Sequence, residues 1–267
     1  IGADIVAYTR AGEADSLMPR FKLRAKVLRG NLPRLFELLT EIIGTSDFSG
    51  SKRIRELVDE EKTGMELSLQ RAANQVVASR IAAYLTPAGA YAEVGGLPFH
   101  DFLSAFKENF DADHAKMQAA FARILPQIFN RNDLILSVTA PASIYDETAE
   151  QLAAFRDTLS AAVFPPAPYT WNICARNEGL TTQSRVQYVA KGANFLKLGY
   201  RYTGTMRVLE TLLRYDYFWT RIRVQGGAYG AMTQFNRNGF MVFSSYRDPN
   251  LAETLDVLDE TADYVRT

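Results

Sequence analysis

The apolar residues in the first third of the chain follow two different spacings. Residues 1–10 and 21–27 alternate between apolar and polar positions, as strands with one buried face do. Residues 33–43 and 51–85 instead carry apolar side chains three and four positions apart, which predicts helices. Asn31 is the expected N-cap of the first helix. The second helix becomes rich in alanine toward its end, so we expect it to pack closely against another element.

The middle of the chain is predicted to hold more helices and one short strand. Helical spacing continues in three segments, residues 99–110, 112–129 and 146–162. Residues 134–139 (LILSVT) form a continuous apolar run that predicts a buried strand. Three prolines fall within residues 164–169 (FPPAPY), a stiff sequence that suits neither a helix nor a central strand. We therefore predict a domain boundary here, with domains at 1–164 and 170–267.

The last hundred residues repeat the mixture of strands and helices. We expect a strand at 184–190, an aromatic-rich helix at 200–223 and a hairpin whose strands are 228–235 and 240–246. Asn238-Gly239 is the turn of that hairpin, and a final helix follows Asp248-Pro249. Antiparallel signals outweigh regular strand–helix–strand alternation. The predicted class is therefore α+β, with two domains that each pack long helices on one face of an antiparallel sheet.

Composition and charge exclude several classes of protein. The 267 residues include 30 basic and 30 acidic side chains, so the formal net charge is zero. This balance argues against general nucleic-acid or anionic-membrane binding, and no apolar run is long enough to predict a transmembrane helix. The chain begins at Ile1 without an initiator methionine and ends inside a helical pattern. We therefore expect a truncated piece of a longer polypeptide.

The familiar catalytic and metal-binding patterns are missing from the sequence. Neither His-Glu-x-x-His nor its inverse occurs, and the two histidines, His100 and His114, are more simply explained as capping or surface residues. Cys174 is the single cysteine, and no histidine is near it in sequence, so a structural thiol is expected. We predict no metal site in this chain.

A glycine-rich stretch, Gly226-Gly227-Ala228, is the most unusual local feature. It follows a helix and precedes a strand, the reverse of a phosphate-binding loop. Arg223 and Tyr229 flank it and could donate hydrogen bonds to a carbonyl oxygen or a developing oxyanion. From the residues alone, a structural interpretation is favoured over this one: Arg223 pairs with a carboxylate or a helix end, and Tyr229 packs in the sheet.

The octapeptide RVQGGAYG at 223–230, followed by SYRDPN at 245–250, resembles the presequence-protease branch of the insulinase/pitrilysin zinc metallopeptidases. SRVQYVAKG at 184–192 resembles the same branch, and the resemblance extends over nearly the whole chain. It implies two homologous halves, each of two α+β domains, that close around a peptide chamber. This chain resembles the second half, with 1–164 as the third domain and 170–267 as the fourth, both truncated.

The resemblance also implies roles for particular residues. Arg223 and Tyr229 match the arginine and tyrosine with which the second half binds substrate backbone and stabilises the attacked carbonyl oxygen. Gly226, Gly227 and Ala228 are the expected substrate-binding turn between them. Zinc is expected in the other, N-terminal half, so this chain would bind none and would be inactive alone. Peptides and that zinc-binding half are its implied partners, in a bacterial cytoplasm or a mitochondrial matrix.

Two other functions remain open from the sequence. The chain could be a non-catalytic binding or scaffold subunit of the same fold that partners a separate zinc-bearing chain. It could also be a generic α+β interaction domain in which the glycine stretch is only a tight turn.

Overall fold

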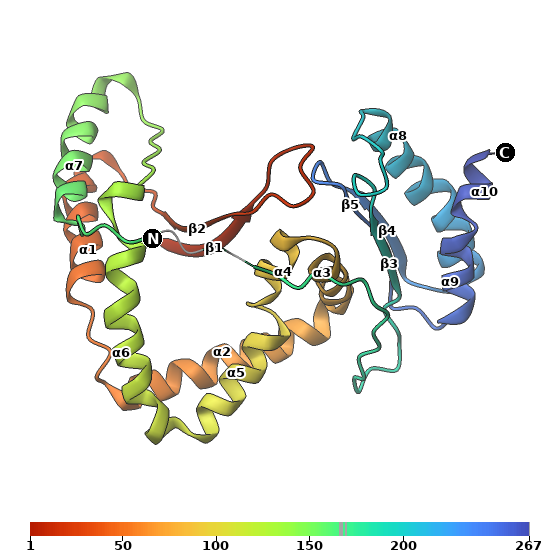
Figure 1. The fold of residues 1–267 in the computed structure, drawn as a ribbon, viewed down its shortest axis with the longest axis horizontal. Helices are drawn as coiled ribbons and strands as arrows, with labels where there is room; N and C mark the ends of the chain where they lie inside the picture. The colour runs from red at the N-terminus through yellow and green to blue at the C-terminus, as the bar shows by residue number, and fades with distance from the viewer. Residues whose placement is uncertain (166–167, 169, 267) are drawn as a thin grey trace. The chain divides into compact units, whose positions relative to one another are not determined.

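A computed structural model of the chain describes residues 1–165, 168 and 170–266 (Figure 1). They form two compact units that interleave along the sequence. Unit 1 contains Ile1–Ile5, Phe21–Glu60 and Ser104–Tyr169, and unit 2 contains Val6–Arg20, Glu61–Leu103 and Thr170–Thr267. The predicted linker 164–169 includes residues 166, 167 and 169, which lie outside the described residues. The division into domains 1–164 and 170–267 stays a prediction.

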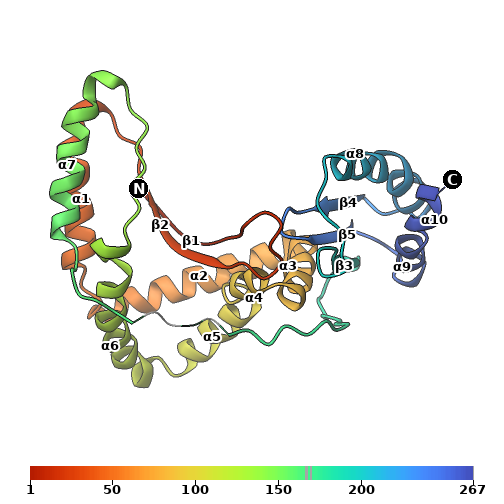
Figure 2. The same ribbon diagram turned by 45° about the horizontal axis from the view of Figure 1, so that its top comes forward.

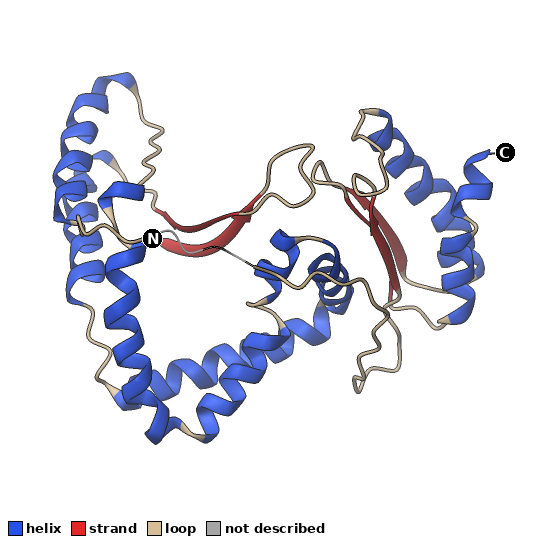
Figure 3. Cartoon of the chain, in the orientation of Figure 1, coloured by secondary structure: helices blue, strands red, loops and turns tan. Residues whose placement is uncertain are grey.

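Strands and helices are both plentiful, and the strands form two separate antiparallel groups (Figure 3). The α+β class is thereby confirmed. The strands are β1 (Gly2–Tyr8), β2 (Met18–Arg24), β3 (Ala190–Asn194), β4 (Gly230–Phe235) and β5 (Phe240–Tyr246). The helices of the first part are η1 (Arg29–Asn31), α1 (Leu32–Thr45), α2 (Ser51–Arg71), α3 (Ala73–Leu85), α4 (Pro87–Glu93), α5 (Leu97–Glu108), α6 (Phe110–Ile128), η2 (Arg131–Asp133), η3 (Ala142–Ile144) and α7 (Tyr145–Thr158). The later helices are α8 (Thr205–Leu212), η4 (Leu213–Tyr217), η5 (Trp219–Gln225), α9 (Ala252–Asp259) and α10 (Thr261–Arg266).

The core of unit 1 lies between α1 and α7, which run side by side (Figures 1 and 2). Leu32, Phe36 and Leu39 of α1 pack against Phe155 of α7 and the adjacent Leu159. These α1 positions recur at the three- and four-residue spacing that predicted the helix. Asn31 occupies the N-cap position, although its side chain makes no capping hydrogen bond.

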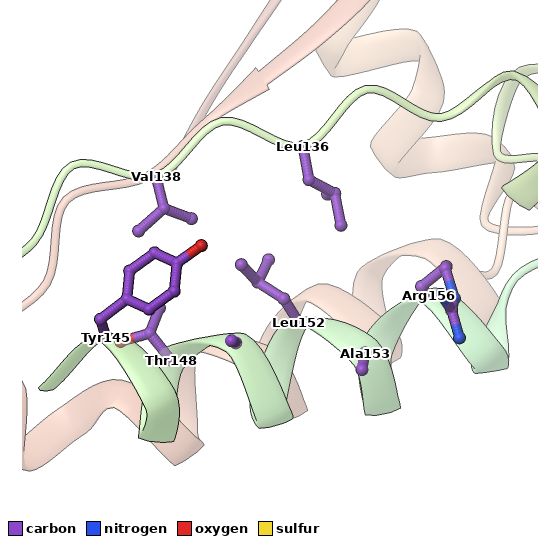
Figure 4. Close-up of a pocket in the computed structure, with 8 residues that line it drawn as sticks. Leu136, Val138, Tyr145, Thr148, Leu152, Ala153 and Arg156 are labelled. Atoms are coloured by element: carbon purple, nitrogen blue, oxygen red, sulfur yellow. The ribbon is translucent and has the colours of Figure 1, made fainter.

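The expected strand at 134–139 is wrong for this structure. The segment is extended but pairs with no other strand among the described residues. Its apolar side chains Leu136 and Val138 instead face α7 across a groove of about 310 Å³, lined also by Tyr145 and Leu152 (Figure 4). A β-branched apolar run favours extended backbone, but a strand also requires a partner for its hydrogen bonds.

Unit 2 is built on the three-stranded sheet β3–β5–β4. Antiparallel pairing places Ala190 opposite Ser244 in β3–β5 and Gly230 opposite Tyr246 in β4–β5. The predicted hairpin is correct, and Gly239 takes a φ of +90° in its turn. The expected strand 184–190 is largely wrong, because β3 starts only at Ala190. Before it, Gln187 makes an isolated bridge to Asp248.

Helices cover both faces of this sheet, whereas we expected one covered face (Figures 1 and 2). On one face, Phe235 and Phe243 of the sheet pack against Leu213, Phe218 and Ile222 of the α8–η5 helix, and α9 adds Val257 and Leu258. On the other face, α3 packs against β3 and β5. The approach is close: a Cβ added to Gly192 in β3 would lie 2.7 Å from Ile81 Cγ2 of α3.

The single helix expected over 51–85 is two helices, α2 and α3. Ala72 separates them with φ −122° and ψ 35°, outside helical geometry. An alanine carries no signal for such a break, because it is the best helix former. The alanine-rich α3 is nevertheless the helix that packs closely on the sheet, as its composition indicated.

A polar network attaches the segment after the proline-rich region to α3. Arg80 of α3 donates to both carboxylate oxygens of Glu178, from Nε at 2.8 Å and from Nη2 at 2.6 Å. Arg176 and Arg80 both donate to the Tyr84 hydroxyl, and Arg80 also lies 3.4 Å from the buried Glu93. Hydrogen bonds from Arg80 lower the pKa of Glu178 to about 2, against the opposing effect of burial.

We expect Glu178→Gln to reduce the free energy of unfolding at pH 7 by roughly 1 kcal/mol, since the ion pair is only partly shielded from water. The folded-state pKa of Glu178 is depressed, so its stabilising effect is complete above the ordinary pKa and is lost as pH falls through about 2. The stability difference between the two proteins should therefore shrink between pH 4.5 and pH 2.

Urea unfolding of both proteins across this pH range measures the effect. Glu150→Gln is the matched control, because Glu150 is exposed on α7 and should show no such difference. A Glu178→Gln difference that stays constant from pH 7 to pH 2 would contradict the assignment.

Candidate functional site

The long helix of unit 2 changes its winding before it reaches the candidate site. Residues Thr205–Leu212 are α-helical, but Leu213–Tyr217 and Trp219–Gln225 have π-helical hydrogen bonding. π-Helical turns are uncommon and occur frequently at functional sites. Ile222 is buried in the core, so the helix presents its neighbour Arg223 away from the core, partly exposed.

The helix ends in a turn that is closed by its own backbone. Gly226 N–H donates to the Arg221 carbonyl at 3.0 Å, and Gly227 N–H donates to the Arg223 carbonyl at 3.0 Å. Ala228 N–H then reaches back to the Ile222 carbonyl at 3.1 Å. Gly227 has a φ of +80°, the left-handed conformation that favours glycine after a helix.

This geometry limits what the predicted substrate-binding turn can do. The N–H groups of Gly226, Gly227 and Ala228 are all engaged within the chain, and the Ala228 side chain is buried in the core. They are therefore not free to donate to a peptide. The structural function that the described contacts indicate for these three residues is to hold the turn.

Tyr229 leaves the turn on the solvent side, immediately before β4. Its N–H donates to the carbonyl oxygens of Tyr246 and Arg247 at 3.0 and 3.3 Å, while its side chain is 65% exposed. The Tyr229 and Tyr246 rings pack in a T-shaped arrangement, with centroids 5.9 Å apart. The backbone of Tyr229 is thus fixed, and its hydroxyl makes no hydrogen bond to any described residue.

The structure brings Arg223 and Tyr229 together, as the sequence predicted. The Arg223 guanidinium lies 5.7 Å from the centre of the Tyr229 ring and 4.0 Å above the Trp219 ring. No carboxylate of the described residues forms an ion pair with Arg223, whereas its neighbour Arg221 pairs with Glu260 at 2.9 Å. Stacking on Trp219 orients a planar guanidinium while leaving its N–H groups available. The two side chains thus form a pair of hydrogen-bond donors on one exposed surface.

The sequence did not identify the residues that support this pair. Trp219 lies within the predicted aromatic-rich helix 200–223, and its four-residue spacing from Arg223 is a signal from which the stacking could be predicted. Asn250 ends the SYRDPN segment, and its side-chain amide donates a hydrogen bond to the Gly226 carbonyl. That contact joins residues 24 positions apart, which no local pattern reveals.

Within the part of the chain that the structure describes, there is neither a cluster of metal ligands nor a helix that could span a membrane. No group of three histidine, cysteine, aspartate or glutamate side chains is placed to hold an ion. No helix there combines the length and the apolar character needed to cross a bilayer. The described residues of this chain therefore do not fit zinc.

Comparison with known proteins identifies the chain at the level of family. Residues 1–106 match a family described as associated with subfamily C of the M16 peptidases, and residues 177–267 match one described as "PreP C-terminal domain". The chain is 29% identical over 261 residues to Protein HypA of Clostridium perfringens, covering 97% of this chain and 27% of that protein.

Two presequence proteases are similar to the chain over most of its length. Presequence protease 1, chloroplastic/mitochondrial, of Arabidopsis thaliana is 31% identical over 252 residues, covering 91% of this chain and 23% of that protein. Presequence protease, mitochondrial, of Drosophila melanogaster is 24% identical over 257 residues, covering 91% and 24%. The chain thus spans about a quarter of the length of the curated relatives it matches. The predicted family is confirmed: this chain is a presequence-protease-type segment of the M16 peptidases, from the C-terminal half.

Proposed function

We propose that this chain is the part of a metallopeptidase that supplies Arg223 and Tyr229 to the peptide being cleaved. The observation that carries the proposal is the donor pair itself: the partly exposed Arg223 guanidinium lies 5.7 Å from the centre of the exposed Tyr229 ring and is unpaired with any described carboxylate. The names of the relatives support a peptidase, and short unstructured peptides are the substrate class that the family resemblance implies.

The chemistry of the pair suits a carbonyl oxygen that gains negative charge. The guanidinium of Arg223 and the phenol of Tyr229 both donate hydrogen bonds. As the carbonyl carbon is attacked, its oxygen becomes more negative, so the same donors bind the transition state more strongly than the substrate. Stacking on Trp219 and the fixed Tyr229 backbone place these donors before substrate binds, which reduces the cost of reorganisation.

The proposal assigns the remaining catalytic groups to another part of the polypeptide. By resemblance, zinc and its ligands belong to the N-terminal half, and the described residues here hold no ligand set. The donor pair and the zinc-bearing half would then be active only together, so the chain alone would not cleave peptides. If the zinc site is carried by a separate polypeptide, this chain would instead be a non-catalytic binding or scaffold subunit that partners it.

In the complete enzyme, we expect Tyr229→Phe to lower kcat/KM for peptides about 10²- to 10³-fold, the usual cost of losing one oxyanion donor, or ~2.7–4 kcal/mol of barrier. The melting temperature should change little, because the hydroxyl bonds no described residue. Steady-state cleavage of a fluorogenic peptide measures the effect.

Tyr215→Phe is the control for this experiment. Tyr215 is similarly exposed, at 63%, but lies earlier, in the η4 stretch of the helix that leads to the turn, and its substitution should leave turnover unchanged. Wild-type kcat/KM in Tyr229→Phe would refute the oxyanion role.

We expect the separate 1–267 chain to bind no stoichiometric zinc, because its described residues provide no ligand set. Elemental analysis after gel filtration in the presence of one equivalent of zinc measures this. The complete enzyme, carried through the same steps, is the positive control. One tightly held zinc per 1–267 chain would contradict the assignment of the metal to the other half.

A further inference from the structure

The turn between Arg223 and Tyr229 also makes contacts with the loop that follows β5. Asn250 Nδ2 donates to the Gly226 carbonyl oxygen at 2.6 Å. The same loop passes over Gly227, where Pro249 Cγ would lie 3.6 Å from an added Cβ. The turn is therefore in contact with a second segment of unit 2 at its two glycines.

The loop itself is anchored by a buried carboxylate. Asp248 is 0% exposed and accepts hydrogen bonds from the Asn250 N–H at 2.9 Å and from Thr254 Oγ1 at 2.8 Å. Its backbone exchanges two hydrogen bonds with Gln187, at 2.8 and 2.9 Å. Asn250 thus extends from a rigid base, so its amide can fix the position of the group it bonds.

The other side of the turn is attached to the same loop. Tyr229 N–H donates to the carbonyl oxygens of Tyr246 and Arg247, immediately before Asp248. Arg247 has a φ of 50°, an uncommon conformation for a residue other than glycine, asparagine or aspartate. Residues 246–250 therefore contact the turn both before and after Gly227.

We propose that Asn250 is a positioning residue that sets the separation of the Arg223 and Tyr229 side chains through its bond to the Gly226 carbonyl. The inference rests on the proposed function of that pair. The two donors act on one oxygen, so their spacing determines how well both can reach it. A displacement of about 1 Å in such a group can cost 100-fold in rate.

A double-mutant cycle in the complete enzyme tests this role. We expect Asn250→Ala to lower kcat/KM about 10- to 100-fold, with the larger part of the loss in kcat. In the Tyr229→Phe background the same substitution should cost much less, about twofold, because one of the two donors whose spacing it sets is already absent.

Asn194→Ala is the matched control. Asn194 is another asparagine of unit 2 whose side chain bonds backbone groups, here the N–H of Leu196 and Lys197. It is buried, whereas Asn250 is partly buried, and it pairs with Phe240 at the other end of β5. It should lower the melting temperature at least as much as Asn250→Ala while leaving kcat unchanged. Hydrogen exchange should accelerate at residues 226–229 in Asn250→Ala and not in Asn194→Ala.

The outcomes separate the two proposals. If Asn250→Ala costs the same factor with and without the Tyr229 hydroxyl, or if kcat is unchanged, the positioning role is overturned while the proposed function stands. If Tyr229→Phe alone has wild-type activity, the proposed function fails and the positioning role fails with it. Should Asn250→Ala not fold, Asn250→Ser, which retains a short polar side chain, takes its place in the same cycle.

Discussion

The turn from the η5 helix into β4 is the constraint on which the candidate site depends. Ile222, immediately before Arg223, is 1% exposed, and Ala228, immediately before Tyr229, is 4% exposed. Both belong to the same hydrophobic core. Burial of these two neighbours fixes where Arg223 and Tyr229 leave the protein surface. The packing of Ile222 and Ala228 in the core therefore positions Arg223 and Tyr229, their neighbours in sequence. The same close-packed core stabilises unit 2 as a whole.

The winding of the helix is part of the same constraint. At a helix end of this kind, nested hydrogen bonds normally close the last turn. Here the outer hydrogen bond joins the Ala228 N–H to the Ile222 carbonyl. It spans one residue more than the corresponding bond at the end of an α-helix, in keeping with the π-helical hydrogen bonding of Trp219–Gln225. The N–H groups of Gly226, Gly227 and Ala228 all donate hydrogen bonds within the turn. Recognition of a peptide therefore falls to side chains, and a backbone oxyanion hole is not available at Gly226, Gly227 or Ala228.

The fold could be predicted where the signal is local and not where it depends on a distant partner. The hairpin is predicted from the local pair Asn238-Gly239, and the turn lies there, closed by the Gly239 N–H bond to the Asn236 carbonyl with Gly239 at a φ of +90°. The strand expected at 134–139 failed because β-branched composition favours extended backbone but cannot supply a neighbour to pair with. The start of β3 at Ala190 likewise depends on a partner, because it is where pairing with Ser244 of β5 begins.

The site divides in the same way. From the residue types alone, Arg223 and Tyr229 could be purely structural. The family resemblance is what predicts a functional role for them. Their proximity in the structure agrees with that choice, while their roles remain a proposal. Trp219 lies within reach of sequence reasoning, since it is four positions from Arg223 on one helix. Asn250 could not be predicted from the sequence, because its bond joins it to Gly226, 24 positions away. The pairing of β5 with β4 brings these two residues together.

Asp248 shows why the site and the stability of unit 2 are difficult to separate. A buried carboxylate is costly unless its oxygens accept hydrogen bonds, and here Asn250 N–H and Thr254 Oγ1 both donate to it. Thr254 lies in the first turn of α9, where the helix dipole also favours a negative charge. Asn250 thus has two functions: its backbone N–H stabilises the buried Asp248 carboxylate, and its side-chain amide bonds the Gly226 carbonyl. Loss of Asp248 would disturb α9, the Gln187 bridge and the turn together, whereas loss of the Asn250 amide removes only the contact with the turn. The Asn250 side chain is therefore the point in this cluster where the placement of the donor pair can be changed with the least effect on the fold.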